Sequence, residues 1–242
     1  MPTPRKLFYG GIVVVALVLA GTYWSWAGLW VPMYQKLAGQ RTVADVLERY
    51  GPAAQERLRP HFEAAGVPFP PKEIALLAFK DARRLELYAD TGGRWVRVRD
   101  YEVLRASGGA GPKLREGDRQ VPEGLYALEG LNPNSRHHVS MKVSYPNEYD
   151  RAMAQRDGRT DLGGDIFVHG GASSIGCLAM GDEAAEELFV LSASIGYENV
   201  RLVIAPTDFR KNDASPPPGA PPWVPELYAR LRAEVRSFER AR

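Results

Sequence analysis

The stretch DIFVHGGASSIGCLAMGDEAAEELFVLSASIG, residues 165–196, contains three successive patterns that indicate how this part of the chain folds. It opens with a short apolar run typical of a strand, which ends at His169. A loop rich in Gly and Ser follows, and it contains Cys177, the only cysteine of the 242 residues. The remainder predicts a helix capped by Asp182 and closed by Gly196. The stretch therefore predicts a strand, a loop and a helix, with a histidine and a cysteine at the two ends of the loop.

The chain on either side of this unit predicts a mainly β domain over residues 71–207. Short apolar or alternating runs separated by Gly, Pro and Asn are typical of strands. Such runs are EIALLAFK, RLELYAD, RWVRVRDYEVL, GLYALE, HVSMKVSY and NVRLVIAP. The segments NPNS and YPNEYD predict turns. We expect a β-rich fold, sandwich-like or barrel-like, with one helix inserted after Cys177.

Helices are predicted on both sides of this domain. Residues 40–70 form a lead-in with apolar side chains at helical spacing, which Pro52 is expected to break in two and Gly66 to end. Residues 208–242 begin as a proline-rich linker and end in a short amphipathic helix, with Leu227, Leu231 and Val235 on one side.

Residues 1–32 indicate where the domain is located. Arg5 and Lys6 precede an apolar run that ends in a cluster of aromatic residues, a pattern typical of a single membrane span whose N-terminus is cytoplasmic. Ser25 and Ala27 stand at positions that a signal peptidase prefers, so a cleaved signal peptide is the alternative. We expect a periplasmic domain anchored in the inner membrane or, under the alternative, a secreted one.

Composition and charge exclude several classes of function. The net charge is +2, and acidic and basic residues are interspersed, so no nucleic-acid partner is expected. Four histidines and one cysteine without metal-ligand spacing argue against zinc. No phosphate loop or dinucleotide fingerprint is present in the sequence, and we expect no cofactor.

A single cysteine is a packing residue, an intermolecular link or a reactive thiol. A thiol is a poor nucleophile until it is ionised, and an imidazole within reach lowers the thiol pKa and accepts its proton. Glycines at 170, 171 and 176 would let the loop turn His169 towards Cys177 and would leave amide groups open for an oxyanion. The residues alone permit this chemistry and leave the packing role open.

The string HGGASSIGCLAM, residues 169–180, resembles the active-site motif of L,D-transpeptidase (YkuD-like) catalytic domains, and among them the YafK type. Two further blocks resemble YafK-type proteins: GPKLREGDRQVPEGLY, residues 111–126, and LNPNSRHHVSMKVSYPNEYDRA, residues 131–152. ASGG, residues 106–109, followed by VPEGLY fits the pattern of the broader family. The likeness covers residues 72–206 and implies the L,D-transpeptidase fold.

The resemblance also implies roles for single residues. Cys177 would be the acylated nucleophile, and His169 would act first as its general base and then as the acid. The carbonyl of Gly170 would orient the imidazole. Ser174 and Gly176 would shape the oxyanion hole together with the Cys177 amide.

Two positions depart from the pattern of many family members, which have a histidine where this chain has Ile175 and an arginine where it has Ala179. These departures put the acceptor chemistry in question. Lys113, Arg115 and Arg119 lie in a charged insert that is either a solvated loop or a contact for substrate carboxylates.

The family activity implied is attack of a thiolate on an amide beside the L centre of meso-diaminopimelate, which gives a thioester and an amine. An amine acceptor then makes a cross-link, whereas water makes the enzyme a hydrolase, which in YafK-type members detaches a lipoprotein from the wall. The implied partners are peptidoglycan stem peptides, a wall-linked lipoprotein and the inner membrane. A wall-binding module with a vestigial site and a structural partner of an envelope assembly are the non-catalytic alternatives. The presence of both His169 and Cys177 favours an enzyme.

His137 and His138 are expected in a strand, one of them facing the cleft.

Overall fold

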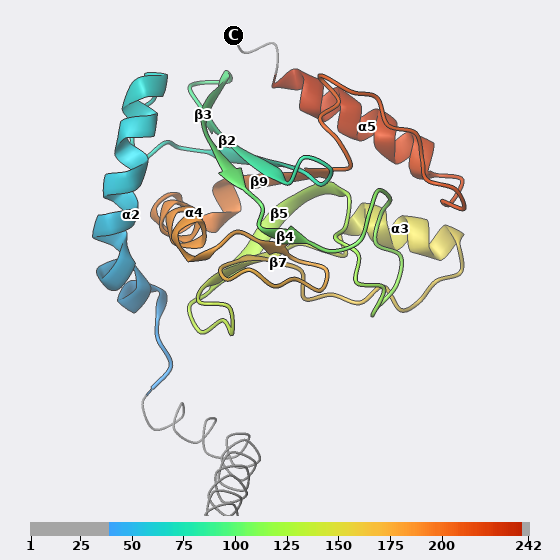
Figure 1. The fold of residues 1–242 in the computed structure, drawn as a ribbon, viewed down its shortest axis with the longest axis horizontal. Helices are drawn as coiled ribbons and strands as arrows, with labels where there is room; N and C mark the ends of the chain where they lie inside the picture. Colours follow the sequence, from blue (N-terminus) through green and yellow to red (C-terminus); the bar gives the residue numbers. More distant parts are fainter. Residues whose placement is uncertain (1–38, 239–242) are drawn as a thin grey trace, which may run out of the picture. The chain divides into compact units, whose positions relative to one another are not determined.

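The computed structural model describes residues 39–238, so the predicted anchor or signal segment lies outside the described residues. The described residues form a nine-stranded sheet with helices on both of its faces (Figure 1). Among them, no helix is both long enough and apolar enough to cross a membrane.

The strands follow the order β3-β2-β1-β9-β5-β6-β7-β8-β4 across the sheet. Only two neighbouring pairs in it, β1 with β9 and β7 with β8, run parallel. The strands are β1 (Ile74–Phe79), β2 (Arg84–Asp90), β3 (Trp95–Glu102), β4 (Arg105–Ala106), β5 (Gly124–Asn132), β6 (Ser140–Val143), β7 (Phe167–His169), β8 (Leu178–Ala179) and β9 (Val200–Ala205). The mainly β fold is confirmed, although the two-residue strands β4 and β8 were too short to predict.

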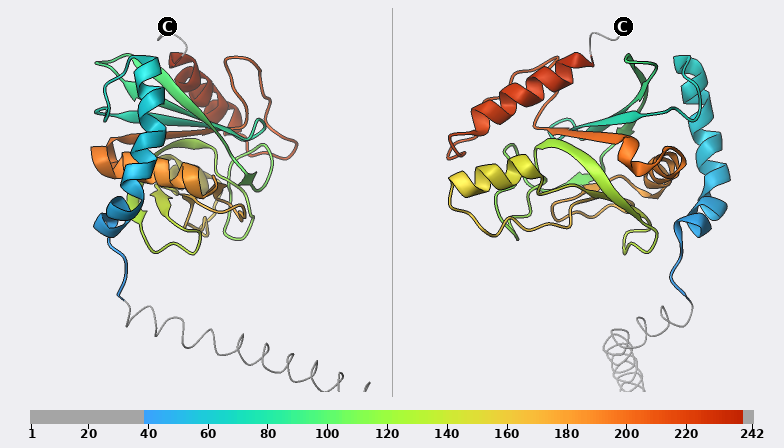
Figure 2. Two further views of the ribbon diagram at one scale, coloured as in Figure 1. Left: turned by 60° about the vertical axis from the view of Figure 1, so that its left-hand side comes forward. Right: turned by 180° about the vertical axis from the view of Figure 1, so that it is seen from behind.

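Burial on both faces explains why β1 is apolar throughout. Ile74, Leu76 and Ala78 belong to a core that includes side chains of the helices α2 (Val43–Ala65) and α4 (Asp182–Ile195). The alternate residues of the strand belong to a second core with α3 (Glu148–Arg156) and α5 (Val224–Ser237). Figure 2 shows the two pairs of helices on opposite sides of the sheet. A strand buried on both faces reads as a continuous hydrophobic run.

The lead-in helix α2 is continuous from Val43 to Ala65, so the predicted break at Pro52 is wrong. Proline removes one backbone hydrogen bond, but one face of the helix buries Leu58 and Phe62 completely, and this packing favours a single helix. Gly66 ends the helix in the left-handed conformation, as predicted.

The inserted helix α4 is confirmed, but its cap differs from the prediction. Gly181 is the N-cap residue and makes no side-chain cap. Asp182 is the first helical residue, and its Oδ1 accepts a hydrogen bond from the amide of Gly171 at 2.8 Å. The carboxylate therefore fixes the loop that follows His169.

The helix α3 occupies residues where a turn was predicted. Asn147 and Asp150 form a capping box, in which each side chain accepts a hydrogen bond from the other residue's amide. The predicted amphipathic C-terminal helix is present as α5, and its three named apolar residues are buried. The proline-rich segment before α5, the loop at residues 110–120 and residues 158–161 line a pocket of about 780 Å³.

Candidate active site

Adjacent parallel strands place Cys177 beside His169. Val168 pairs with Leu178 and His169 with Ala179, and Cys177 directly precedes β8. In this register Cys177 stands one position before β8, so its backbone lies next to β7, the strand that ends at His169. Strand pairing thus brings together the two residues that the loop separates in sequence.

The imidazole of His169 is buried and held in one tautomer. Only 3% of His169 is exposed, and Nδ1 lies 2.6 Å from the carbonyl oxygen of Gly170. A carbonyl can only accept, so Nδ1 carries the proton and Nε2 carries the lone pair of a base. Burial lowers the pKa of His169, the hydrogen bond to Gly170 opposes this, and His137 lowers it further. His169 is therefore neutral at pH 7.

Gly170 is required by its surroundings. A Cβ atom there would lie 2.6 Å from Oδ1 of Asp182 and 2.8 Å from the carbonyl oxygen of His137. These contacts are too close for any side chain. A glycine therefore lets the backbone reach the position from which its carbonyl binds the imidazole.

The thiol of Cys177 is protonated in the resting site. Its Sγ donates to the carbonyl oxygen of Asp165 at 3.7 Å, and no hydrogen bond joins it to His169 in the described part of the chain. Burial raises the pKa of Cys177 and the charge of Asp165 adds to this, whereas the amide of Phe167 and the charge of Lys113 lower it. The expectation that an adjacent imidazole lowers the thiol pKa is wrong for this state, because His169 is neutral and burial is the largest cause of the shift.

The amides expected to be open for an oxyanion are occupied by serine hydroxyls. The Cys177 amide donates to Oγ of Ser174 at 3.0 Å, and the same hydroxyl donates to the Cys177 carbonyl at 2.6 Å. The Gly176 amide donates to Oγ of Ser107 at 2.6 Å. A substrate oxygen would have to displace these hydroxyls. Ser107 lies in the ASGG block, which is the signal that could have identified it.

The charged insert divides into one buried and two exposed cations. Nζ of Lys113 donates to the Arg115 carbonyl at 2.8 Å and to Oδ1 of Asp118 at 2.7 Å, and the residue is only 7% exposed. Lys113 is thus neither a solvated side chain nor free to bind a carboxylate. Arg115 and Arg119 are exposed.

Two histidines lie in a turn before β6, and the expectation that they are strand residues is wrong. The ring of His137 stacks on that of His169, with centroids 4.5 Å apart and planes 27° apart. His138 instead points to α4, where its Nε2 lies 2.8 Å from Oε1 of Glu186. Among residues 39–238, no three His, Cys, Asp or Glu side chains are grouped to hold a metal ion.

The two positions that depart from the family pattern have opposite environments. Ile175 is 76% exposed on the loop before Cys177, whereas Ala179 is fully buried in β8. A side chain at position 175 is open to solvent. An arginine at position 179 would have to displace the core.

Comparison with known proteins identifies the family of this domain. The YkuD family, L,D-transpeptidase catalytic domain, matches residues 74–194, which is half of the chain. The Escherichia coli K12 protein "Putative L,D-transpeptidase YafK" is 35% identical over 147 residues, 59% of this chain and 56% of the relative, so the match spans little more than half of that protein. The helical cell shape determining protein Pgp2 of Campylobacter jejuni is 20% identical with a TM-score of 0.46, over 56% of this chain and 48% of its own. L,D-transpeptidase 1 of Mycobacterium tuberculosis is 13% identical with a TM-score of 0.33, over 55% of this chain and 62% of its own. The chain belongs to the YkuD family of L,D-transpeptidase catalytic domains.

Proposed function

We propose that this protein is a peptidoglycan-modifying enzyme in which Cys177 is the acylated nucleophile and His169 the general base. The observation that carries the proposal is the state of the two side chains. A neutral imidazole, with its Nδ1 proton held by Gly170, lies at the end of β7, and a protonated thiol lies directly before β8, the neighbouring parallel strand. Such a pair performs nucleophilic catalysis by proton transfer during the attack.

In the first step, Cys177 Sγ attacks the carbonyl carbon of an amide beside the L centre of meso-diaminopimelate. The thiol proton passes to Nε2 of His169 as the S–C bond forms. The C–N bond then breaks, the proton moves from Nε2 to the leaving nitrogen, and a thioester and a free amine result. The Gly170 carbonyl stabilises the imidazolium that exists between the two transfers.

In the second step, water or an amine attacks the thioester and Cys177 is released. An amine competes with about 55 M water only when the protein holds it, because positioning supplies several kcal/mol. Ile175 offers an apolar, exposed side chain where many relatives have a histidine, and Ala179 is buried. These two positions favour hydrolysis, including release of a wall-linked lipoprotein, over cross-linking.

The proposed location is the periplasm, with the N-terminal segment in the inner membrane. Arg5 and Lys6 before a long apolar run support this location. Alkaline phosphatase fused after residue 40 should be active. Activity of a cytoplasmic reporter alone at that junction would contradict the proposal.

Product analysis tests the proposed reaction. The full-length protein is incubated with tetrapeptide muropeptides or lipoprotein-linked sacculi, and the products are separated by mass. We expect hydrolysed products to exceed cross-linked ones, and Cys177→Ala to form neither. Products from Cys177→Ala at the wild-type rate would refute the mechanism, and mainly cross-linked product would refute the preference for water.

One substitution tests the acceptor argument separately. Ile175→His places an imidazole on an exposed position, so it should raise the ratio of cross-linked to hydrolysed product while acylation continues. Ile175→Gln is the matched control for polarity alone. An equal ratio in both variants and the wild type would contradict the argument.

A further inference from the structure

The ring of His137 packs against the catalytic imidazole and has no part in the mechanism described above. The two rings stack at 4.5 Å with 27° between their planes. His137 is exposed, whereas His169 is 3% exposed. His137 thus stands between the imidazole and solvent, where a flat side chain limits rotation of the ring beneath it.

The backbone of the His137 turn runs along the loop that follows His169. The Gly170 amide donates to the carbonyl of Val139 at 3.2 Å. A Cβ atom at Gly170 would meet the His137 carbonyl at 2.8 Å and Cβ of His138 at 3.0 Å. These contacts fix the position of the His137 turn relative to the loop that follows His169.

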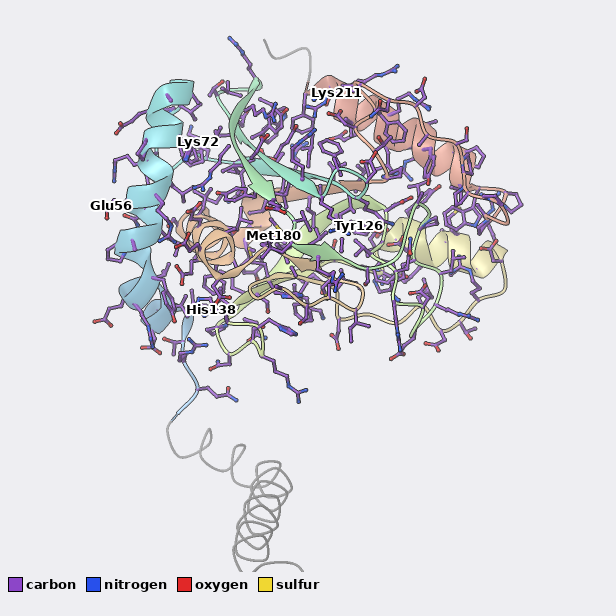
Figure 3. All side chains as sticks on the ribbon, viewed as in Figure 1. Glu56, Lys72, Tyr126, His138, Met180 and Lys211 are labelled. Atoms are coloured by element: carbon purple, nitrogen blue, oxygen red, sulfur yellow. The ribbon has the colours of Figure 1, made fainter. Side chains whose placement is uncertain are left out.

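His138 holds this turn in a conformation that L-residues rarely adopt. Its φ is 73°, in the left-handed region, which is strained for a residue that is not glycine. Its Nε2 lies 2.8 Å from Oε1 of Glu186, and its ring meets Tyr50 of α2 edge-on at 4.9 Å. Arg57 of α2 binds the other oxygen of Glu186 at 3.0 Å. Figure 3 shows His138 close to α2.

We propose that His137 is a positioning residue for His169, stacked on the imidazole so that Nδ1 stays on the Gly170 carbonyl and Nε2 stays available as the base. The strained turn at His138 places the ring of His137 against the imidazole of His169. The inference rests on the proposed function, in which His169 is the base.

The ring of His137 also affects the protonation of His169. Protonated His137 would oppose protonation of its stacked partner, and His137 is a cause of the lowered pKa of His169. The other charged groups near this pair are Asp182, bound to the Gly171 amide, and Asp165 and Lys113 beside the thiol.

Nitrogen NMR of the histidine side chains tests the inference without any substrate. The chain has four histidines, so a ¹⁵N-histidine sample of the full-length protein gives few signals, and His169→Gln assigns one of them. His137→Phe keeps a flat ring but cannot be charged, whereas His137→Ala removes the ring. His61→Ala, on α2, is the matched control.

We expect His137→Phe to keep the Nδ1–H tautomer of His169 and to shift its pKa upwards. His137→Ala should populate the other tautomer and reduce the rate of muropeptide conversion about tenfold or more, with His137→Phe recovering most of the rate. Circular dichroism confirms that each variant is folded. An unchanged tautomer in His137→Ala overturns the inference, and so does a His137→Phe variant as slow as His137→Ala, which would assign the imidazole a chemical role. Because the NMR signals need no turnover, wild-type protein that is inactive on muropeptides contradicts the proposed function while the tautomer still decides this inference.

Discussion

Cys177 is the only cysteine of the chain, so the rate of thiol alkylation at different pH values reports on this residue alone. Burial raises the pKa of Cys177, and the charge of Asp165 raises it further. Lys113 and the Phe167 amide lower it without reversing the shift. The resting thiol must therefore lose its proton to solvent before it reacts with iodoacetamide.

The size of the effect follows from the direction of the shift. A thiol whose pKa lies above its ordinary value of 9.0 is less than about 1% ionised at pH 7. Its alkylation rate should rise about tenfold for each pH unit between 6 and 8, because the thiolate is the reacting species. A thiolate paired with protonated His169 would instead react quickly and at a nearly constant rate over that range.

Intact-mass measurement of the full-length protein at several times and pH values gives these rates. Asp165→Asn removes a negative charge that raises the thiol pKa, so it should react faster than the wild type at pH 7. Asp161→Asn is the matched control, since Asp161 is exposed and does not shift the pKa of Cys177. A flat rate between pH 6 and 8 in the wild type would refute the protonated resting thiol.

Three other substitutions probe the site and its scaffold. Ser174→Ala removes both hydrogen bonds that hold the Cys177 backbone, one at its amide and one at its carbonyl, so the nucleophile loses its fixed position; we expect slower acylation by about tenfold with unchanged folding, measured by product formation and circular dichroism. Gly170→Ala creates a clash with Asp182 and should lower the melting temperature as well as abolish turnover, both read from one purified sample. Glu86→Gln removes the charge of a fully buried carboxylate that forms ion pairs with three arginines. It should reduce the free energy of unfolding by about 3 kcal/mol, measured in a denaturant titration.

The strands could be predicted because the pattern of apolar residues in the sequence follows their burial. IALLAF is apolar throughout and lies between two cores, and RLELYAD coincides with β2. The helix α3 was missed because the capping box of Asn147 and Asp150 follows a Tyr-Pro turn signal, which obscured it. The break predicted at Pro52 failed because packing of α2 outweighed the lost hydrogen bond.

The identity of the site residues could be proposed from a motif, but their protonation states could not. The thiol pKa depends on burial and on the charge of Asp165. Asp165 itself has a positive φ of 53°, and its carbonyl oxygen accepts the hydrogen bond from Sγ. The stack of His137 on His169 depends on a turn that no local pattern specified, since His138 has no sequence mark of a positive φ. Tertiary contacts decide both features.

Trapping the thioester would identify the nucleophile itself. The full-length protein is mixed with tetrapeptide muropeptides, quenched in acid during turnover and digested for peptide mass analysis. Acylation by Cys177 predicts an added mass equal to the substrate acyl group on the peptide that contains Cys177, removed by hydroxylamine and formed more slowly in His169→Gln. Turnover with no adduct on that peptide, or an adduct on another residue, would contradict the mechanism.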